Sequence, residues 1–146
     1  MKVLLLRPNS RMIMAPMPLG LGYVAEAIRR ARRDEVTILD GRNLRMSTDE
    51  IALRIRDFNA DVVGITAMIM DSREMHNVVT TIKREAPDRK VIVGGPYASS
   101  SPQTILDNRN IDVAIIGEGE QTIVEVLDAL EEDRALEDIK GIAFRR

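Results

Sequence analysis

Apolar residues along this chain cluster in five short runs, each four to six residues long and rich in Val, Ile and Leu. Dense β-branched runs of this length are typical of strands that are covered on both faces. We therefore predict strands over residues 2–6, 35–40, 61–66, 90–93 and 111–116.

The segments between these runs have helical periodicity. In residues 19–33, for example, Leu21, Val24 and Ile28 fall on one stripe, and Ser47-Thr-Asp-Glu50 reads as a capping box. Asp71-Ser-Arg-Glu74 offers a similar helix start. The predicted helices cover residues 19–33, 47–58, 71–86, 101–108 and 120–132.

The regular alternation of strands and helices predicts an α/β fold. We expect a doubly wound, flavodoxin-like (Rossmann-like) parallel five-stranded sheet of order 2-1-3-4-5, with helices on both faces. In such sheets, ligands bind outside the carboxyl ends of the strands. A last apolar run, Gly141 to Phe144, is compatible with either a strand or a linker.

Composition excludes several classes of function. A net charge of −2 gives no electrostatic reason to expect nucleic acid or an anionic membrane as partner. No apolar stretch approaches the ~20 residues of a membrane span. Cysteine is absent, which excludes disulfides, cysteine nucleophiles and cysteine-bound iron–sulfur clusters in this chain and fits the reducing cytoplasm.

Two neighbouring predicted strands end in glycines, at Val91-Ile-Val-Gly-Gly-Pro-Tyr97 and Ile115-Ile-Gly-Glu-Gly-Glu-Gln121. Glycine brings bare backbone to the edge of the sheet, where a flat or bulky ligand can approach. The two carboxylates of the second motif disfavour a phosphate cradle. The candidate binding residues here are Gly94, Gly95, Pro96, Tyr97, Gly117, Glu118, Gly119 and Glu120.

Two further loops follow strands at the same edge. The loop from Arg7 to Gly22 is long and rich in Met and Pro, which suits packing on a flat ligand, although it could also fold onto the domain's own core. After the third strand, the Thr66 hydroxyl could bind a ligand or only local backbone. These loops add the candidates Pro8, Asn9, Gly20, Thr66, Ala67, Met68 and Ile69.

No catalytic set or metal site is predicted. The phosphate-loop motif is missing, and Gly20-Leu-Gly22 lacks the third glycine of a dinucleotide fingerprint. His76 is the single histidine, and we interpret it as structural because no companion ligand lies near it in the sequence. The arginines between Arg29 and Arg33 are expected to remain solvated at the end of a helix.

Motifs along almost the whole chain match one family in order and spacing. The chain resembles the N-terminal cobalamin (B12)-binding domain of B12-dependent radical SAM enzymes, both methyltransferases and anaerobic magnesium-protoporphyrin monomethyl ester cyclases. The matching segments are Pro16-Met-Pro-Leu-Gly-Leu-Gly-Tyr23, Val36-Thr-Ile-Leu-Asp40, Val63-Gly-Ile-Thr66, Val91-Ile-Val-Gly-Gly-Pro96, Asp112-Val-Ala-Ile-Ile-Gly-Glu-Gly-Glu120 and Ile139-Lys-Gly-Ile-Ala-Phe144.

The resemblance implies a corrin across the carboxyl edge, with its dimethylbenzimidazole tail between the sheet and helices. Thr66-Ala67-Met68 would replace the family's Ser-x-Leu segment, and Gly94-Gly95 would make room for the tail, flanked by residues 117–120. The loop from Asn9 to Gly20 lacks the histidine that ligates cobalt in related B12 domains. The resemblance therefore implies base-off cobalamin without a histidine ligand, with Asn9, Met12 and Met14 packing near the cobalt.

The resemblance also implies a longer parent enzyme. Residues 1–138 would form the cobalamin-binding domain, and residues 139–146 would begin a linker to a C-terminal radical SAM domain. S-adenosylmethionine and a [4Fe-4S] cluster would bind outside this cysteine-free chain, which would be non-catalytic by itself. The alternatives are a corrin-free α/β regulatory or interaction module and a nucleotide or flavin binder. The scarcity of aromatic residues argues against flavin.

Overall fold

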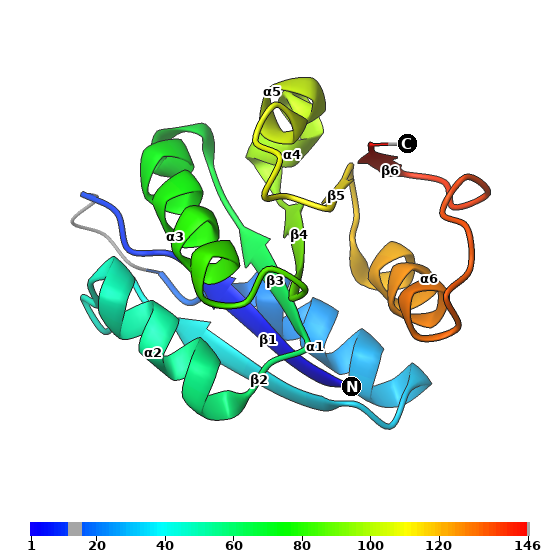
Figure 1. The fold of residues 1–146 in the computed structure, drawn as a ribbon, viewed down its shortest axis with the longest axis horizontal. Helices are drawn as coiled ribbons and strands as arrows, with labels where there is room; N and C mark the ends of the chain where they lie inside the picture. Colours follow the sequence, from blue (N-terminus) through cyan, green and yellow to red (C-terminus); the bar gives the residue numbers. More distant parts are fainter. Residues whose placement is uncertain (12–15, 146) are drawn as a thin grey trace.

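Six strands form one sheet in this computed structural model, which describes residues 1–11 and 16–145 (Figure 1). Strands β1 to β5 pair in parallel, and β6 runs antiparallel to β5. In sheet order the strands are β2 (Glu35–Asp40), β1 (Lys2–Arg7), β3 (Val62–Thr66), β4 (Lys90–Gly94), β5 (Val113–Ile115) and β6 (Ile142–Phe144).

The predicted α/β fold is confirmed, but the predicted five-stranded, all-parallel sheet is wrong. The apolar run after the last helix is a sixth strand, so the order is 2-1-3-4-5-6. Gly141 adopts a left-handed φ of 75°, and its carbonyl accepts a hydrogen bond of 2.8 Å from the Ile116 amide. This turn reverses the chain onto the edge of β5, a pairing that a three-residue apolar run does not signal.

The helices cover both faces of the sheet (Figure 1). Helices α1 and α6 pack together on one face, whereas α2 and α3 pack together on the other. The longest helix, α3, has 14 residues, and no helix of residues 1–11 and 16–145 could cross a bilayer. The helices are α1 (Leu19–Ala31), α2 (Thr48–Phe58), α3 (Ser72–Glu85), α4 (Pro96–Ser100), α5 (Pro102–Leu106) and α6 (Glu120–Glu131), with a 3₁₀ turn, η1 (Ile69–Asp71).

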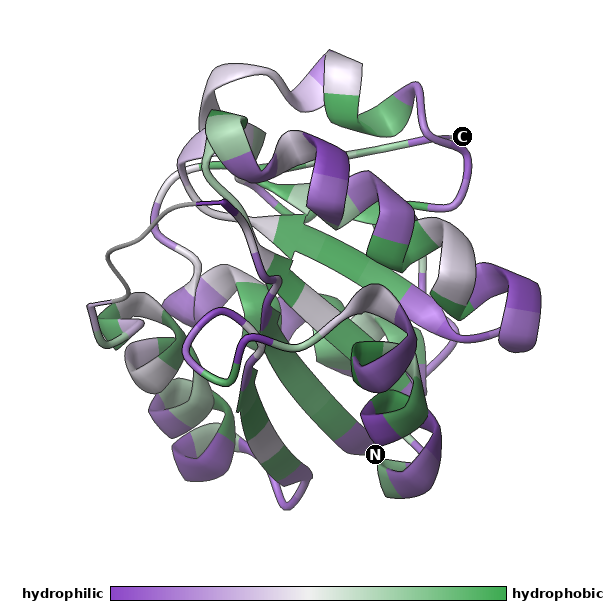
Figure 2. Ribbon diagram, turned by 90° about the vertical axis from the view of Figure 1, so that its left-hand side faces the viewer, coloured by the Kyte–Doolittle hydropathy of each residue, from purple (hydrophilic) through white to green (hydrophobic). Residues whose placement is uncertain are grey.

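Side chains alternate along the strands between two hydrophobic cores. Leu4 and Leu6 of β1 pack toward α2 and α3, whereas Val3 and Leu5 pack toward α1 and α6. Figure 2 shows the central strands as a continuous hydrophobic layer between these helices. This two-sided burial explains why the strand sequences are dense in apolar residues.

The ends of the helices confirm one local prediction and correct others. Ser47 and Glu50 form the predicted capping box, with the Glu50 amide 3.2 Å from Ser47 Oγ. Helix α3 starts at Asp71 as predicted, but the Asp71 side chain does not cap it, because its carboxylate accepts from the Met68 amide at 3.1 Å. Arg32 is also not solvated as predicted, since its guanidinium is buried against Asp34 and two acidic residues of α6. Helix α4 was not predicted.

Candidate functional site

A cavity of about 240 Å³ opens at the carboxyl ends of β3, β4 and β5, beneath α1 and α6. Its walls come from strand ends, from the first turns of both helices and from the loops after β4 and β5. The lining residues are Leu5, Gly20, Leu21, Val24, Gly64, Ile65, Thr66, Ile92, Gly94, Gly95, Pro96, Ile115, Gly117, Glu118, Gly119, Glu120 and Ile123.

Strand alternation explains why this space is hollow. On β3, the face that carries buried Val62 toward α1 and α6 continues with Gly64 and Thr66. On β4, the same face carries Ile92 and then Gly94. The carboxyl ends of β3 and β4 therefore carry only small residues on this face, which leaves space between them and the first turns of α1 and α6.

Gly94 and Gly95 are glycines for different reasons. Gly95 has a φ of +88°, and a Cβ there would lie 2.7 Å from Thr66 Oγ1, so the fold itself requires glycine. At Gly94 the nearest contact of a Cβ would be Ile115 Cβ at 3.9 Å. Since the protein itself does not require glycine at position 94, the missing side chain leaves space for a ligand.

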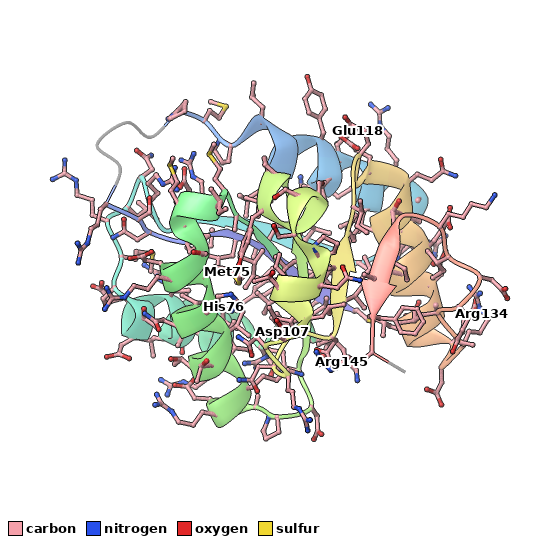
Figure 3. All side chains as sticks on the ribbon, turned by 90° about the horizontal axis from the view of Figure 1, so that it is seen from above. Met75, His76, Asp107, Glu118, Arg134 and Arg145 are labelled. Carbon is pink, nitrogen blue, oxygen red and sulfur yellow. The ribbon has the colours of Figure 1, made fainter. Side chains whose placement is uncertain are left out.

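The mouth of the cavity carries its polar side chains. Thr66 ends β3 and is half-buried, and Glu120 is the first residue of α6. Figure 3 shows Glu118 in the turn before α6, where the side chain is exposed. The turn is fixed by Gly117, which has a φ of +81° and donates its amide hydrogen to Ser99 Oγ at 2.9 Å.

Large apolar side chains are exposed around the same edge of the sheet. Met68, Ile69 and Met70, which we call the β3 lip, follow β3 and are 44%, 64% and 54% exposed. Met17 and Leu19, at the start of α1, are 76% and 61% exposed. Clustered exposed apolar residues of this kind mark a ligand or partner surface.

The structure brings nine of the predicted site residues together in the cavity lining: Gly20, Thr66, Gly94, Gly95, Pro96, Gly117, Glu118, Gly119 and Glu120. Six others lie elsewhere. Met68 and Ile69 lie on the exposed lip, Pro8, Ala67 and Tyr97 are buried, and Asn9 donates to the Met46 carbonyl at 3.1 Å. Met12 and Met14 lie outside the described residues.

Sequence reasoning missed the apolar part of the lining. The missed residues are Leu5, Leu21, Val24, Gly64, Ile65, Ile92, Ile115 and Ile123. Gly64 had a usable signal, because a glycine inside a buried strand marks a close approach or a gap. The aliphatic residues had none, since their sequence pattern is the same as that of ordinary core positions.

His76 lies away from the cavity, on α3 on the opposite face of the sheet (Figure 3). Its Nδ1 is 2.9 Å from Asn108 Nδ2, and its ring contacts Tyr97 edge to face at 6.3 Å. Asn108 Oδ1 accepts from the Asn110 amide, which turns the Asn108 NH₂ group toward His76 as donor. The imidazole is therefore an acceptor at Nδ1, and burial lowers its pKa below the ordinary value.

Comparisons of the sequence with known proteins identify relatives. A family model described as the B12 binding domain matches residues 15–127. An uncharacterized methyltransferase of Pyrococcus horikoshii is 32% identical over 99% of this chain and 33% of its own length. The anaerobic magnesium-protoporphyrin IX monomethyl ester cyclase of Rubrivivax gelatinosus is 26% identical over 99% of this chain and 28% of its own. The chain thus spans about a third of these relatives.

Solved structures share the fold at low sequence identity. The radical S-adenosylmethionine methyltransferase TsrM of Kitasatospora setae, with cobalamin and a [4Fe-4S] cluster bound, matches with a TM-score of 0.84 and 23% identity over 99% of this chain and 29% of its own. The cobalamin-dependent S-adenosylmethionine radical enzyme OxsB, with aqua-cobalamin bound, matches with a TM-score of 0.86 and 18% identity. The match covers 98% of this chain and 20% of OxsB. The receiver domain of Salmonella RcsB matches with a TM-score of 0.66 and 16% identity, over 93% of this chain and 91% of its own. At these identities, the matches establish the fold.

Proposed function

The chain belongs to the B12-binding domain family, and we propose that it holds cobalamin at the carboxyl edge of its sheet as a module of a radical SAM enzyme. The main support for this proposal is the position of Gly94. Its position requires no glycine for backbone geometry or internal packing, so the space beside it fits a bulky ligand group. The nucleotide tail of cobalamin would enter there, between the strand ends and the helices α1 and α6.

The residues present suit base-off binding without a histidine ligand. The sequence contains one histidine, His76, and it lies on the opposite face of the sheet from the cavity. The Thr66 hydroxyl stands at the inner side of the mouth, where it can hydrogen-bond the tail base. Glu118 and Glu120 can accept hydrogen bonds from hydroxyl or amide groups that pass between them.

The exposed apolar residues at this edge support a flat ligand above the cavity. The β3 lip and the side chains of Met17 and Leu19 offer exposed apolar surface next to lining residues of the cavity, and their methionines are flexible and polarizable. The corrin would rest on this surface. When bound, cobalamin supplies a cobalt centre for methyl transfer or radical chemistry, and this chain's residues would bind, orient and shield it.

A further domain would complete the enzyme. The chain covers about a third of its curated relatives, and its lack of cysteine leaves no ligand for an iron–sulfur cluster. We therefore propose that residues 1–138 form the cobalamin module and that residues 139–146 add β6 to the edge of its sheet before the chain leads toward a radical SAM domain. This further domain would bind S-adenosylmethionine and the [4Fe-4S] cluster. The parent reaction would be a methyl transfer or a cyclisation in the reducing cytoplasm.

Anaerobic titration with hydroxocobalamin, followed by visible absorbance, tests the proposal. We expect saturable binding and the spectrum of base-off cobalamin. A spectrum with a nitrogen lower ligand would contradict base-off binding while keeping the cofactor. No binding up to high micromolar protein would favour the corrin-free regulatory or interaction module.

A further inference from the structure

The floor of the cavity is apolar throughout. Leu5, Ile92 and Ile115 of the strands are between 1% and 4% exposed, and Leu21 and Ile123 cover them from the helices. The floor therefore offers no side-chain hydrogen-bond donor or acceptor to a ligand group that reaches it.

The backbone of the floor is also unavailable for hydrogen bonding. Gly64 pairs in register with Leu5 on one side and with Ile92 on the other. Because β3 and β4 have paired strands on both sides, their amide and carbonyl groups are used in the sheet. A polar group pressed against this floor would lose its water partners without gaining protein ones.

Hydrogen-bonding side chains among the lining residues stand only at the mouth. They are Thr66 at the end of β3, Glu118 in the exposed turn and Glu120 at the start of α6. A ligand group in the cavity thus meets polar partners where it enters and only hydrocarbon beyond them.

We infer, on the premise of the proposed function, that this cavity selects among cobamides by the chemistry of their lower base. It favours a benzimidazole, whose outer ring carries only C–H and methyl groups, over a purine with ring nitrogens and an amine. The cavity is large enough for a two-ring base, because an aliphatic cavity of about 150 Å³ holds benzene and this cavity measures about 240 Å³.

The expected discrimination follows from the cost of burying a polar group without a partner. For an amine or ring nitrogen against this floor, that cost corresponds to roughly 10- to 100-fold weaker binding. A benzimidazole carries no such penalty on its outer ring. Its single unsubstituted ring nitrogen can remain near the hydroxyl of Thr66 at the mouth.

Titration of the chain with three probes that share one corrin ring tests this inference. The probes are cobalamin, the adenine-containing cobamide and cobinamide, which lacks the base, and the readout is Kd from absorbance. We expect cobalamin to bind at least about tenfold tighter than the other two. Equal Kd values for cobalamin and the adenine cobamide, or for cobalamin and cobinamide, would overturn the inference while leaving cobalamin binding intact. Failure of cobalamin to bind would overturn the proposed function as well.

A substitution in the cavity wall tests whether the lining residues cause this selectivity for the lower base. Val24→Thr places a hydroxyl on the α1 side of the cavity without changing the shape of a half-buried residue. We expect it to narrow the Kd ratio of adenine cobamide to cobalamin at least about twofold. Val124→Thr is the matched control, because Val124 is half-buried on α6 outside the lining. Equal Kd ratios of adenine cobamide to cobalamin in Val24→Thr and Val124→Thr would show that the cavity wall does not determine the selectivity.

Discussion

Arg42 Nη2 donates a hydrogen bond of 2.5 Å to Asp71 Oδ1, and the two side chains are only 5% and 3% exposed. Asp71 Oδ2 in turn accepts from the Met68 amide, so this buried ion pair fixes the turn that presents the β3 lip. The exposed apolar surface beside the cavity thus depends on a charged pair beneath it.

Breaking this pair should strongly destabilise the fold. Arg42→Met leaves the Asp71 carboxylate buried without its partner, which costs about 3–5 kcal/mol of unfolding free energy. In the double variant Arg42→Met/Asp71→Asn, the charge is gone while the side-chain oxygen can still accept from Met68. We expect the double variant to recover much of the loss, partly because Arg42 Nε is itself a buried donor without a partner among the described residues.

Urea denaturation of both variants measures these free energies. Arg30→Ala is the control, because the Arg30–Glu26 pair lies on the surface, with side chains 79% and 52% exposed. Such a pair contributes about 0.3–0.5 kcal/mol. An Arg42→Met variant no less stable than Arg30→Ala would contradict a structural role for the buried pair.

Gly94→Val should separate ligand binding from folding. A Cβ at position 94 would meet only Ile115 Cβ within 4 Å, and the valine methyl groups would occupy the cavity, so we expect unfolding free energy within about 1 kcal/mol of the parent. Cobalamin binding should weaken at least about tenfold, because the space for the tail is gone. Titration and urea denaturation of the same sample measure both effects.

Two other glycines complete this experiment. Gly22→Val adds the same side chain in open space outside the cavity lining, so cobalamin affinity should not change. Gly95→Ala should destabilise the fold by about 1–2 kcal/mol or more, since its φ is +88° and Thr66 Oγ1 would crowd the new Cβ. Normal cobalamin binding by Gly94→Val would exclude the cavity as the tail site.

The sequence predicted what depends on local pattern and not what depends on long-range contact. The strands, the longer helices and the capping box at Ser47 follow from periodicity and short-range hydrogen bonds. Strand β6 does not, because a short apolar run becomes a strand only by pairing with β5. Similarly, Gly94 and Gly95 look alike in sequence, and only the contact of Gly95 with Thr66 distinguishes a structural glycine from one that leaves space.

His76 should make stability depend on pH. Burial lowers the pKa of its imidazole in the folded state, so the unfolded chain binds a proton more readily. The contribution of neutral His76 is therefore complete above the unfolded pKa of about 6.5 and is lost as pH falls toward the lower folded pKa. Protonation would also place an N–H of the ring against the Asn108 NH₂ group.

Urea denaturation of the parent and of His76→Gln between pH 5 and 8 measures this dependence. We expect the unfolding free energy of the parent to fall more steeply below about pH 6.5 than that of His76→Gln. Identical slopes would show that His76 has the same proton affinity in both states. Cobalamin affinity should be similar in both proteins at pH 8, since His76 lies across the sheet from the cavity.

Arg145 anchors the last strand to the segment before β5. Its guanidinium donates to the carbonyl oxygens of Leu106, Asn108, Arg109 and Ile111 at distances from 2.6 to 3.3 Å. Figure 3 shows Arg145 reaching toward this segment, near Asp107. One side chain therefore satisfies carbonyls at the end of α5 and joins them to β6.

Removing this anchor should loosen the edge of the sheet without unfolding the domain. In Arg145→Ala, β6 keeps its short pairing with β5 and the core packing of Ile142 and Phe144 but loses its hydrogen bonds to the segment before β5, so we expect amide hydrogen exchange in residues 142–144 to accelerate at least about tenfold. Exchange in the central strand β3 should be unchanged, because β3 lies three strands away in the sheet. Arg134→Ala is the matched control, since Arg134 is half-exposed and pairs only with Glu132 among the described residues. Equal exchange of residues 142–144 in both variants would mean that strand pairing and core packing hold β6 without Arg145. A selective increase in Arg145→Ala would show that the hydrogen bonds of Arg145 to the segment before β5 hold β6 against local opening.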